Sequence, residues 1–200
     1  MYRLVQLYLD QDRQNEALDL LIKALPIARR QLREDHPSTL CFVNSYAVFY
    51  TKQKQYNQAE KLFDEALKGR QRKRGEDHPV TLETVNDFGV LRREQRRYDE
   101  AESLLRQALE GRQRKLGLDH PACFETMHEL AVLYKEQARF SEAEPHLLEA
   151  IEGRRLKLGD THPHTLQSLN NLIDLYEAWD KPEKANKCRA KLPQTEAAYE

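Results

Sequence analysis

The dipeptide His-Pro occurs four times in this 200-residue chain, and each occurrence follows the last by 42 residues. The pairs are His36-Pro37, His78-Pro79, His120-Pro121 and His162-Pro163. A constant interval of about 20 to 50 residues is typical of stacked repeats, because each repeat buries its apolar face against its neighbours. This interval constrains the fold more than any other feature of the sequence.

Small residues keep the same 42-residue interval. Alanine occurs at Ala17, Ala59, Ala101, Ala143 and Ala185, and again at Ala24, Ala66, Ala108 and Ala150. Apolar residues near these columns recur at helical spacing, as in Leu166, Leu169, Leu172, Ile173 and Tyr176. This pattern therefore predicts two helices joined by a short polar turn in each repeat, and an all-α fold for the whole chain.

Signals for helix ends place each His-Pro pair at the start of the first helix of a repeat. Proline suits the first helical position because its missing N–H would have no partner there, and the Asp or His before it can cap the helix. Gly75, Gly117 and Gly159 each precede a pair by three residues, and glycine accepts the left-handed conformation that closes a helix. We therefore interpret the four histidines as architectural.

The remaining glycines predict close packing. Gly69, Gly111 and Gly153 form a 42-spaced column in the second helix, where a neighbouring chain segment is expected to exclude a side chain. Gly89 shares a column with Ala47 and Ala131, which predicts a tight contact between helices.

Polar residues mark both ends of the second helix. Asn57, Asp99 and Ser141 are predicted N-caps, because their side chains accept from unpaired backbone N–H groups. The last turns are rich in Arg72, Lys73, Arg74, Arg112, Arg114, Lys115, Arg154, Arg155 and Lys157. These cations are expected to be mostly solvated and to stabilise the helix C-termini. A patch for nucleic acid or anionic lipid is the alternative interpretation.

Composition argues against several classes of partner. Lys and Arg number 32 against 33 Asp and Glu, so the formal net charge of −1 gives no bulk attraction to nucleic acid. Three scattered cysteines do not make a disulfide framework and favour a reducing compartment. No apolar run approaches the ~18 residues of a membrane helix, and the N-terminus lacks a secretory signal. We expect a cytoplasmic protein with no nucleic-acid or membrane partner.

These columns resemble those of tetratricopeptide repeats. The usual unit has about 34 residues, with small and aromatic residues at fixed places. Matching residues here are Tyr46, Ala47, Tyr50, Ala59, Phe63 and Ala66, and again Leu130, Ala131, Tyr134, Ala143, Leu147 and Ala150. The 42-residue unit is similar to the repeats of kinesin light chains and of nephrocystin-3. The resemblance implies a right-handed α-α superhelix of about five antiparallel helix pairs.

The resemblance also sets the expected domain organisation. We expect a single domain over residues 1–200, with repeats at roughly 1–33, 34–75, 76–117, 118–159 and 160–200. The first repeat is incomplete because it lacks the His-Pro start, which suggests part of a longer protein. The exposed ends of the chain could allow self-association.

The resemblance implies that the first helix of each repeat lines a concave groove that binds a peptide. The groove positions in this chain are Asn44, Val48, Lys52, Asn86, Val90, Arg93, His128, Val132, Lys135, Asn170 and Asp174. An asparagine amide both donates and accepts, so the column of Asn44, Asn86 and Asn170 could clip the backbone of an extended peptide. The alternative is that this column only ties neighbouring helices together. The valines offer shallow apolar contacts.

Charges in the predicted groove are mixed. Lys52, Arg93 and Lys135 face six carboxylates, a difference of −3; the carboxylates are Glu83, Glu94, Glu125, Glu136, Asp174 and Glu177. Kinesin light chains accept acidic peptide motifs, so this chain departs from them. The hypothesis is that its C-terminal half prefers a peptide with apolar residues and at least one Lys or Arg.

No motif points to catalysis. The chain has no Gly-rich phosphate loop, no HExxH sequence and no nucleophile elbow, and its cysteines do not form metal-ligand pairs. His128 and His146 fit helix positions better than a metal site. We therefore expect a non-catalytic protein-binding scaffold without metal or cofactor. A structural spacer or self-association module is the alternative.

Overall fold

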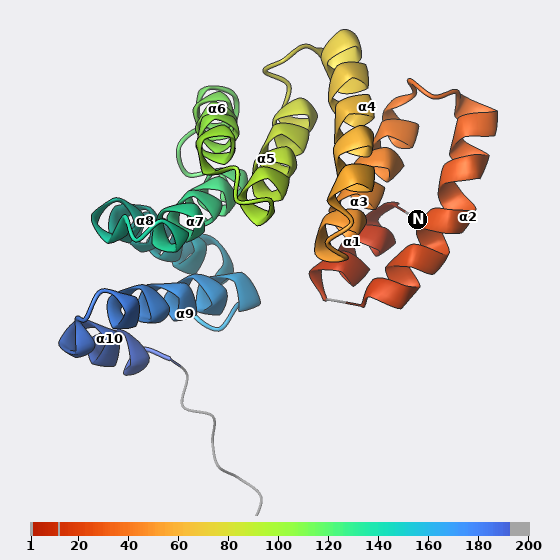
Figure 1. The fold of residues 1–200 in the computed structure, drawn as a ribbon. Coiled ribbons are helices and arrows are strands. Elements are labelled where there is room, and N and C mark those ends of the chain that lie inside the picture. Colours follow the sequence, from red (N-terminus) through yellow and green to blue (C-terminus); the bar gives the residue numbers. More distant parts are fainter. Residues whose placement is uncertain (1, 12, 193–200) are drawn as a thin grey trace, which may run out of the picture. The chain divides into compact units, whose positions relative to one another are not determined.

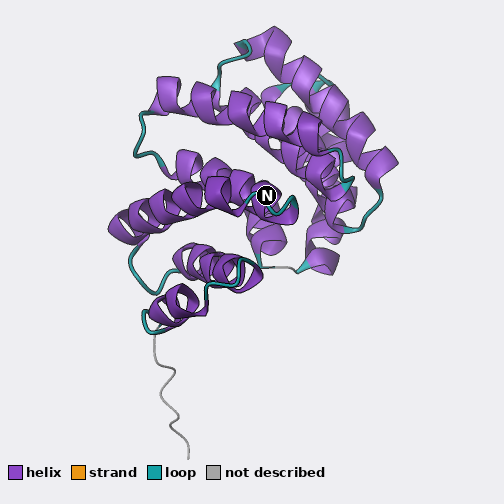
Figure 2. Cartoon of the chain, turned by 60° about the vertical axis from the view of Figure 1, so that its left-hand side comes forward, coloured by secondary structure: helices purple, strands orange, loops and turns teal. Residues whose placement is uncertain are grey.

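The computed structural model describes residues 2–11 and 13–192, and this part of the chain consists of helices joined by short loops, without strands (Figures 1 and 2). The helices are α1 (Tyr2–Asp10), α2 (Gln14–Leu32), α3 (Pro37–Lys52), α4 (Tyr56–Arg74), α5 (Pro79–Glu94), α6 (Tyr98–Leu116), α7 (Pro121–Glu136), α8 (Phe140–Leu158), α9 (Pro163–Ala178) and α10 (Pro182–Arg189). Consecutive helices pack in pairs, so the fold is the predicted solenoid of antiparallel helix pairs.

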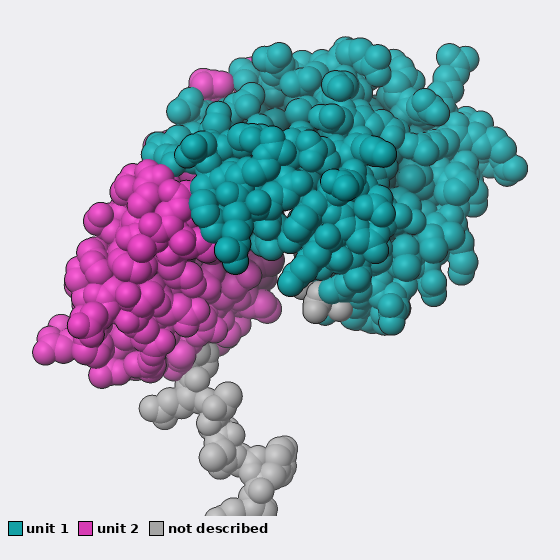
Figure 3. Space-filling model, in the orientation of Figure 1, with its two compact units in different colours: residues 1–111 teal, residues 112–200 magenta. Residues whose placement is uncertain are grey.

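The chain divides into two compact units, Met1–Gly111 and Arg112–Glu200 (Figure 3). The division falls inside α6. Unit 1 holds α1 to α5 with most of α6, and unit 2 holds the end of α6 with α7 to α10.

The 42-residue repeat is visible in the structure as four first helices of equal length that begin at equivalent residues. The helices α3, α5, α7 and α9 each have 16 residues and begin at the proline of a His-Pro pair. In each case the histidine is the N-cap, and its Nδ1 accepts from the backbone N–H two residues later at 3.2–3.3 Å. The architectural role predicted for these histidines is confirmed.

Glycine closes the second helices as predicted. Gly75, Gly117 and Gly159 have φ values of 88°, 89° and 96°, where a side chain would be strained. The corresponding residue in the first repeat is Arg33, and it adopts the same unfavourable conformation with φ of 74° and ψ of 163°. The first repeat therefore keeps the backbone shape of the others without the residue that favours it.

The prediction of N-caps for the second helices is wrong by two positions. Helices α4 and α8 begin at Tyr56 and Phe140, and the residues before them make no side-chain cap. The N–H of Gln55 bonds to the carbonyl of Tyr50 at 2.9 Å, and residues 53–55 alone separate the end of α3 from the start of α4. Asn57 is thus the second residue of its helix.

The alanine and glycine columns lie where helices approach most closely. Ala17, Ala59, Ala101, Ala143 and Ala185 are fully buried. A Cβ built at Gly69 or Gly111 would lie 2.6 Å from a leucine methyl, and one at Gly153 would lie 2.1 Å from the ring of Phe124. The predicted exclusion of a side chain is confirmed at all three positions.

Neighbouring repeats pack through aromatic and aliphatic side chains. In unit 1, the rings of Phe63 on α4 and Phe88 on α5 stack at 5.4 Å, in a cluster with Ala47, Ala59 and Leu91. Such a ring pair contributes about 0.5–1.5 kcal/mol beyond the burial of its area. Within the described residues, no helix is long and apolar enough to cross a membrane.

Candidate functional site

The eleven predicted groove residues lie on α3, α5, α7 and α9, but they differ in exposure. Asn44, Asn86 and His128 are buried; Val48, Val90, Arg93, Val132 and Lys135 are half-buried; Lys52, Asn170 and Asp174 are exposed. Asn170 is therefore the one member of its column that lies on the surface. Positions that share a column in the sequence do not all offer a side chain to a ligand.

Two buried members of this column, Asn44 and His128, tie neighbouring helices together. Asn44 donates from Nδ2 to Oδ2 of Asp87 at 2.8 Å, which joins α3 to α5. In unit 2, His128 on α7 lies 3.1 Å from both Ser168 and Asn171 on α9. These contacts favour the alternative in which Asn44 and His128 only join neighbouring helices.

Two buried acceptors in unit 1 lack a protein donor. The Oδ1 atoms of Asn44 and Asn86 are buried and take no hydrogen bond from the described residues. A buried carbonyl without a partner costs about 1–3 kcal/mol, so such atoms usually bond to ordered water or to a ligand.

The cations of the predicted groove already have partners within the chain. Lys52 donates from Nζ to the carbonyl of Leu9 at 2.7 Å. Arg93 pairs with Glu94 at 3.1 Å, and Lys135 on α7 pairs with Asp174 on α9 at 3.7 Å. The last pair brings two predicted groove residues together within unit 2.

Three arginines of the second helices are buried, contrary to the expectation that the basic helix ends are solvated. Arg70, Arg112 and Arg154, which are 42 residues apart, are 2%, 3% and 6% exposed. Each donates from Nη1 to a backbone carbonyl ten residues later and to a hydroxyl fourteen residues later, in the first turns of the next repeat. The hydroxyls belong to Thr84, Thr126 and Ser168. These arginines bind one repeat to the next.

Their partners change the charge balance inferred from the sequence. Arg70 pairs with Glu83 at 3.3 Å and Arg112 with Glu125 at 3.0 Å, while Arg189 pairs with Glu177. Arg70, Arg112 and Arg189 were not counted when the charges of the predicted groove gave a difference of −3. Adding their three positive charges brings that charge difference to zero. The preference for a basic peptide therefore loses its electrostatic support.

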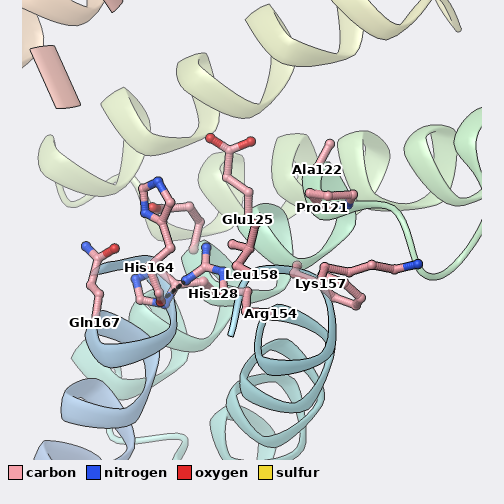
Figure 4. A pocket seen from close by; sticks show the side chains of 11 residues that line it. Pro121, Ala122, Glu125, His128, Arg154, Lys157, Leu158, His164 and Gln167 are labelled. Atoms are coloured by element: carbon pink, nitrogen blue, oxygen red, sulfur yellow. Dashed lines mark hydrogen bonds between the residues drawn. The ribbon is translucent and has the colours of Figure 1, made fainter. Parts of the chain in front are cut away.

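Cavities recur where a buried arginine meets the start of the next helix. In unit 2, a cavity of about 350 Å³ lies between α7, α8 and α9, with Arg154 in its wall (Figure 4). In unit 1, a cavity of about 110 Å³ is lined by Arg70, and each of its seven lining residues lies 84 positions before a lining residue of the larger one. The repeat thus builds the same kind of cavity in both units.

Side chains with catalytic potential are dispersed. Within residues 2–11 and 13–192, no group of three His, Cys, Asp or Glu side chains is placed to hold a metal ion. Cys41, Cys123 and Cys188 are free thiols, and burial raises the pKa of each above its ordinary value. The ring of His146 stacks on Tyr134 at 5.9 Å.

Helix pairs at a constant interval, joined by side chains that recur with it, define an α-helical repeat protein. A family model described as tetratricopeptide repeat matches residues 41–114, 86–156 and 124–188, and a second model with the same description matches residues 1–38. The chain belongs to the tetratricopeptide repeat family. Repeats of this family generally serve as protein–protein interaction scaffolds and are generally not enzymes.

Solved structures with the same fold include kinesin light chain-like repeat proteins. BtubC (BKLC) from P. vanneervenii has a TM-score of 0.73 at 24% identity, covering 94% of this chain and 76% of that one. A Podosopora anserina putative kinesin light chain with nearly identical TPR-like repeats has a TM-score of 0.70 at 24% identity, covering 98% and 95%. Pseudomonas aeruginosa pilF follows at 0.64 and 19%, covering 99% and 76%. No curated protein matches the sequence.

Proposed function

We propose that this chain is a non-catalytic docking module that binds an extended peptide segment of a partner protein along its first helices. Tetratricopeptide repeats generally act as protein-binding scaffolds, which supports the general function. The finer assignment concerns α7 and α9 in unit 2, which carry five of the predicted groove residues.

The exposed amide of Asn170 carries this proposal. Asp174 lies one turn further along α9 on the same face, and its ion pair with Lys135 places that face beside α7. Val132 lies one turn before Lys135 and is half-buried. The Asn170 side chain makes no hydrogen bond with the rest of the described chain, so both its donor and its acceptor remain for a peptide backbone.

A selection from a random peptide display library tests the proposal. Wild type would be compared with Asn170→Ala, and Asn57→Ala on α4 would serve as the matched control because Asn57 is also exposed and helical. We expect wild type and the control to enrich one consensus that binds Asn170→Ala about tenfold more weakly, the cost of a lost hydrogen bond. Equal binding by all three proteins would contradict the assignment.

Self-association is a second candidate function, favoured by exposed leucines on α1. Leu4 and Leu7 are 40% and 46% exposed, whereas their counterparts 84 residues later, Phe88 and Leu91, are buried against Phe63 of the preceding repeat. A second copy of the chain could cover this face through two-fold symmetry. Sedimentation velocity at increasing concentration would show a dimer that Leu4→Gln/Leu7→Gln abolishes; a monomer throughout would reject it.

A further inference from the structure

Two of the second helices, α2 and α8, carry large apolar side chains on their solvent-exposed faces. Ile22 on α2 is 53% exposed, and Leu148 and Leu156 on α8 are 48% and 72% exposed. Helices α4 and α6 are described over their whole length and expose no large apolar side chain. The exposed apolar residues are therefore a feature of two helices rather than of the repeat.

The fold does not require apolar residues at these positions. The 42-spaced column that contains Ile22 also contains Leu148. Its other members, Asp64 on α4 and Arg106 on α6, are charged and make ion pairs along their own helices, at 4.0 Å and 2.9 Å. Leu156 replaces the arginine that every earlier repeat has at its position. Clustered apolar residues that packing within the chain does not explain indicate a contact with another molecule.

The exposed face of α2 combines apolar and cationic residues. Ile22 and Pro26 lie one turn apart along one edge of this face, while Lys23 and Arg30 lie two turns apart along the other edge. All four residues are exposed, and neither Lys23 nor Arg30 has an ion pair within the described chain. We call these four residues the α2 face.

The exposed face of α8 combines apolar and acidic residues. We call it the α8 face, and it consists of Pro145, Leu148, Glu149, Glu152 and Leu156, all of them exposed. Glu149 has no ion pair within the described chain, whereas Glu152 pairs with Arg155 of the same helix at 2.9 Å. Arg155 lies on the edge of Leu148, across the face from Glu149.

Charge makes the two faces complementary to each other but not to themselves. Contact between two α8 faces would bring the carboxylates of Glu149 and Glu152 from both copies together. Contact between two α2 faces would do the same with Lys23 and Arg30. Like charges disfavour both of these pairings, whereas an α2 face against an α8 face joins cations to carboxylates.

An antiparallel arrangement of the two helices matches these charges. It places the cationic edge of α2 along the Glu149 edge of α8, whereas a parallel arrangement would place the cations beside Arg155. With Lys23 opposite Glu152, Arg30 lies about one turn, roughly 6 Å along the axis, from the level of Glu149. The long arginine side chain spans that offset.

The same register covers the apolar side chains. Pro26 then lies within one residue of the level of Leu148, and Ile22 lies about 4.5 Å along the axis from the level of Leu156. Removal of these side chains from water stabilises the contact, while the ion pairs specify its direction.

We propose that the α8 face binds the α2 face of a second copy of this chain, with the two helices antiparallel. The contact is heterologous, because it joins different surfaces of two identical chains. It uses neither the first helices nor the exposed leucines of α1. Two single helix faces bury less than the about 1,200 Å² of a stable complex, so the association is weak and depends on concentration.

Two full-length variants that each keep one face provide the test. Leu148→Gln/Leu156→Gln removes the apolar part of the α8 face and leaves the α2 face intact. Ile22→Gln/Arg30→Glu disables the α2 face and leaves the α8 face intact. In both proteins the two exposed leucines of α1 are also changed to glutamine, so that the α1 face cannot contribute.

Nuclear magnetic resonance follows the isotope-labelled protein with the intact α2 face as the unlabelled protein with the intact α8 face is added. We expect the amide signals of Ile22, Lys23 and Arg30 to shift with a Kd of roughly 0.1–1 mM. Each protein alone should remain monomeric at the same concentrations. Signals that do not shift at up to about 2 mM partner would overturn the proposal.

Exchange of one charge pair tests the predicted register. Glu149→Arg in one protein, or Arg30→Glu in the other, should weaken binding by at least about threefold, and the two changes together should restore most of the loss. Gln107→Arg on α6 is the matched control, because Gln107 is exposed and shares the column of Glu149. We expect it to leave binding unchanged. An exchanged pair that binds no better than the weaker single variant would refute the contact.

Failure of this contact is distinguishable from failure of the functions proposed above. The peptide selection depends on the first helices, and the dimer considered for α1 depends on its leucines. Neither measurement uses the α2 face or the α8 face, so each result stands by itself.

Discussion

Arg92 donates from Nη2 to Oε1 of Glu60 at 2.7 Å and thereby fastens α5 to α4. Tyr176 makes the equivalent contact in unit 2, where its hydroxyl donates to Oε1 of Glu144 at the same distance and the same separation of 32 residues. The 42-spaced column that contains both is otherwise tyrosine, at Tyr8, Tyr50 and Tyr134. Arginine therefore replaces tyrosine without loss of the donor.

Substitution of Arg92 tests whether the donor or the charge matters. Arg92→Leu removes the donor, and we expect the free energy of unfolding to fall by about 1 kcal/mol, because Glu60 is about one-third exposed and water can solvate it. Arg92→Tyr should lose less than half of that amount. Urea denaturation measures both, with Arg30→Leu as an exposed helical control. A tyrosine variant as unstable as the leucine variant would contradict this account.

The same contact predicts a dependence on acid. The hydrogen bond from Arg92 lowers the pKa of Glu60 to about 2 from its ordinary value of 4.5. A carboxylate whose folded-state pKa is depressed stabilises the protein above the unfolded value and loses that contribution as the pH falls through the folded value. We expect the stability difference between wild type and Arg92→Leu to be constant above pH 5 and to shrink as the pH falls from 4.5 towards 2. Urea midpoints at each pH measure it, and a difference that does not change would rule out this linkage.

Arg33 offers a stabilising substitution. It holds φ of 74° and ψ of 163°, a conformation that costs a residue with a side chain about 1–3 kcal/mol. Arg33→Gly should therefore raise the free energy of unfolding by about 1 kcal/mol. Gly75→Ala is the converse control, since an added Cβ there meets no atom within 4 Å and any loss reflects the backbone alone. No gain in Arg33→Gly, together with a loss in Gly75→Ala, would show that the Arg33 side chain offsets its strain.

Features that depend on local chemistry were predictable from the sequence. The His-Pro starts and the glycine stops act through their own backbone and their nearest neighbours, so the 42-residue interval was enough to identify them. The roles of Arg70, Arg112 and Arg154 depend on residues that fold against them from the next repeat. A run of cations at a helix end is typical of a solvated terminus, and only the matching column of Thr84, Thr126 and Ser168 distinguishes the buried members.

The candidate site was predictable in part for the same reason. Periodicity placed the eleven groove residues on the first helices, but it could not distinguish the buried Asn44 and Asn86 from the exposed Asn170. Burial depends on what the next repeat supplies, and Asp87 reaches back to Asn44 only in the folded chain. Column membership thus predicts position in a repeat protein, while exposure depends on each neighbouring pair of repeats.

The close contact at Gly153 predicts an unusually costly substitution. A Cβ there would lie 2.1 Å from Cζ of the buried Phe124 ring, whereas at Gly69 it would lie 2.6 Å from a methyl of Leu40. We expect Gly153→Ala to lower the free energy of unfolding by about 2–4 kcal/mol and Gly69→Ala by about 1 kcal/mol. Urea denaturation of the two variants gives the comparison.

A double-mutant cycle identifies the cause of that cost. Phe124 occupies the position that is Leu40, Leu82 and Leu166 in the other repeats, so Phe124→Leu should recover most of the stability lost in Gly153→Ala. If the free-energy costs of Gly153→Ala and Phe124→Leu simply add in the double mutant, helix propensity or a third group, rather than the ring of Phe124, accounts for the loss of stability.

The capping histidines predict a second effect of pH, centred nearer neutrality. Nδ1 of His78 accepts from the N–H of Val80 at 3.3 Å, and a protonated Nδ1 cannot accept. Burial, together with repulsion from Arg74 and Arg70, lowers the pKa of His78 below its ordinary value of 6.5. The neutral ring is therefore favoured in the folded state. Its contribution to the free energy of unfolding is complete above pH 6.5 and is lost as the pH falls through the lower pKa of the folded state.

An N-cap contributes about 1 kcal/mol, and Asn caps a helix without titrating. We expect His78→Asn to match wild type in thermal stability at pH 8 and to exceed it at pH 5, and parallel curves across that range would exclude titration of the cap.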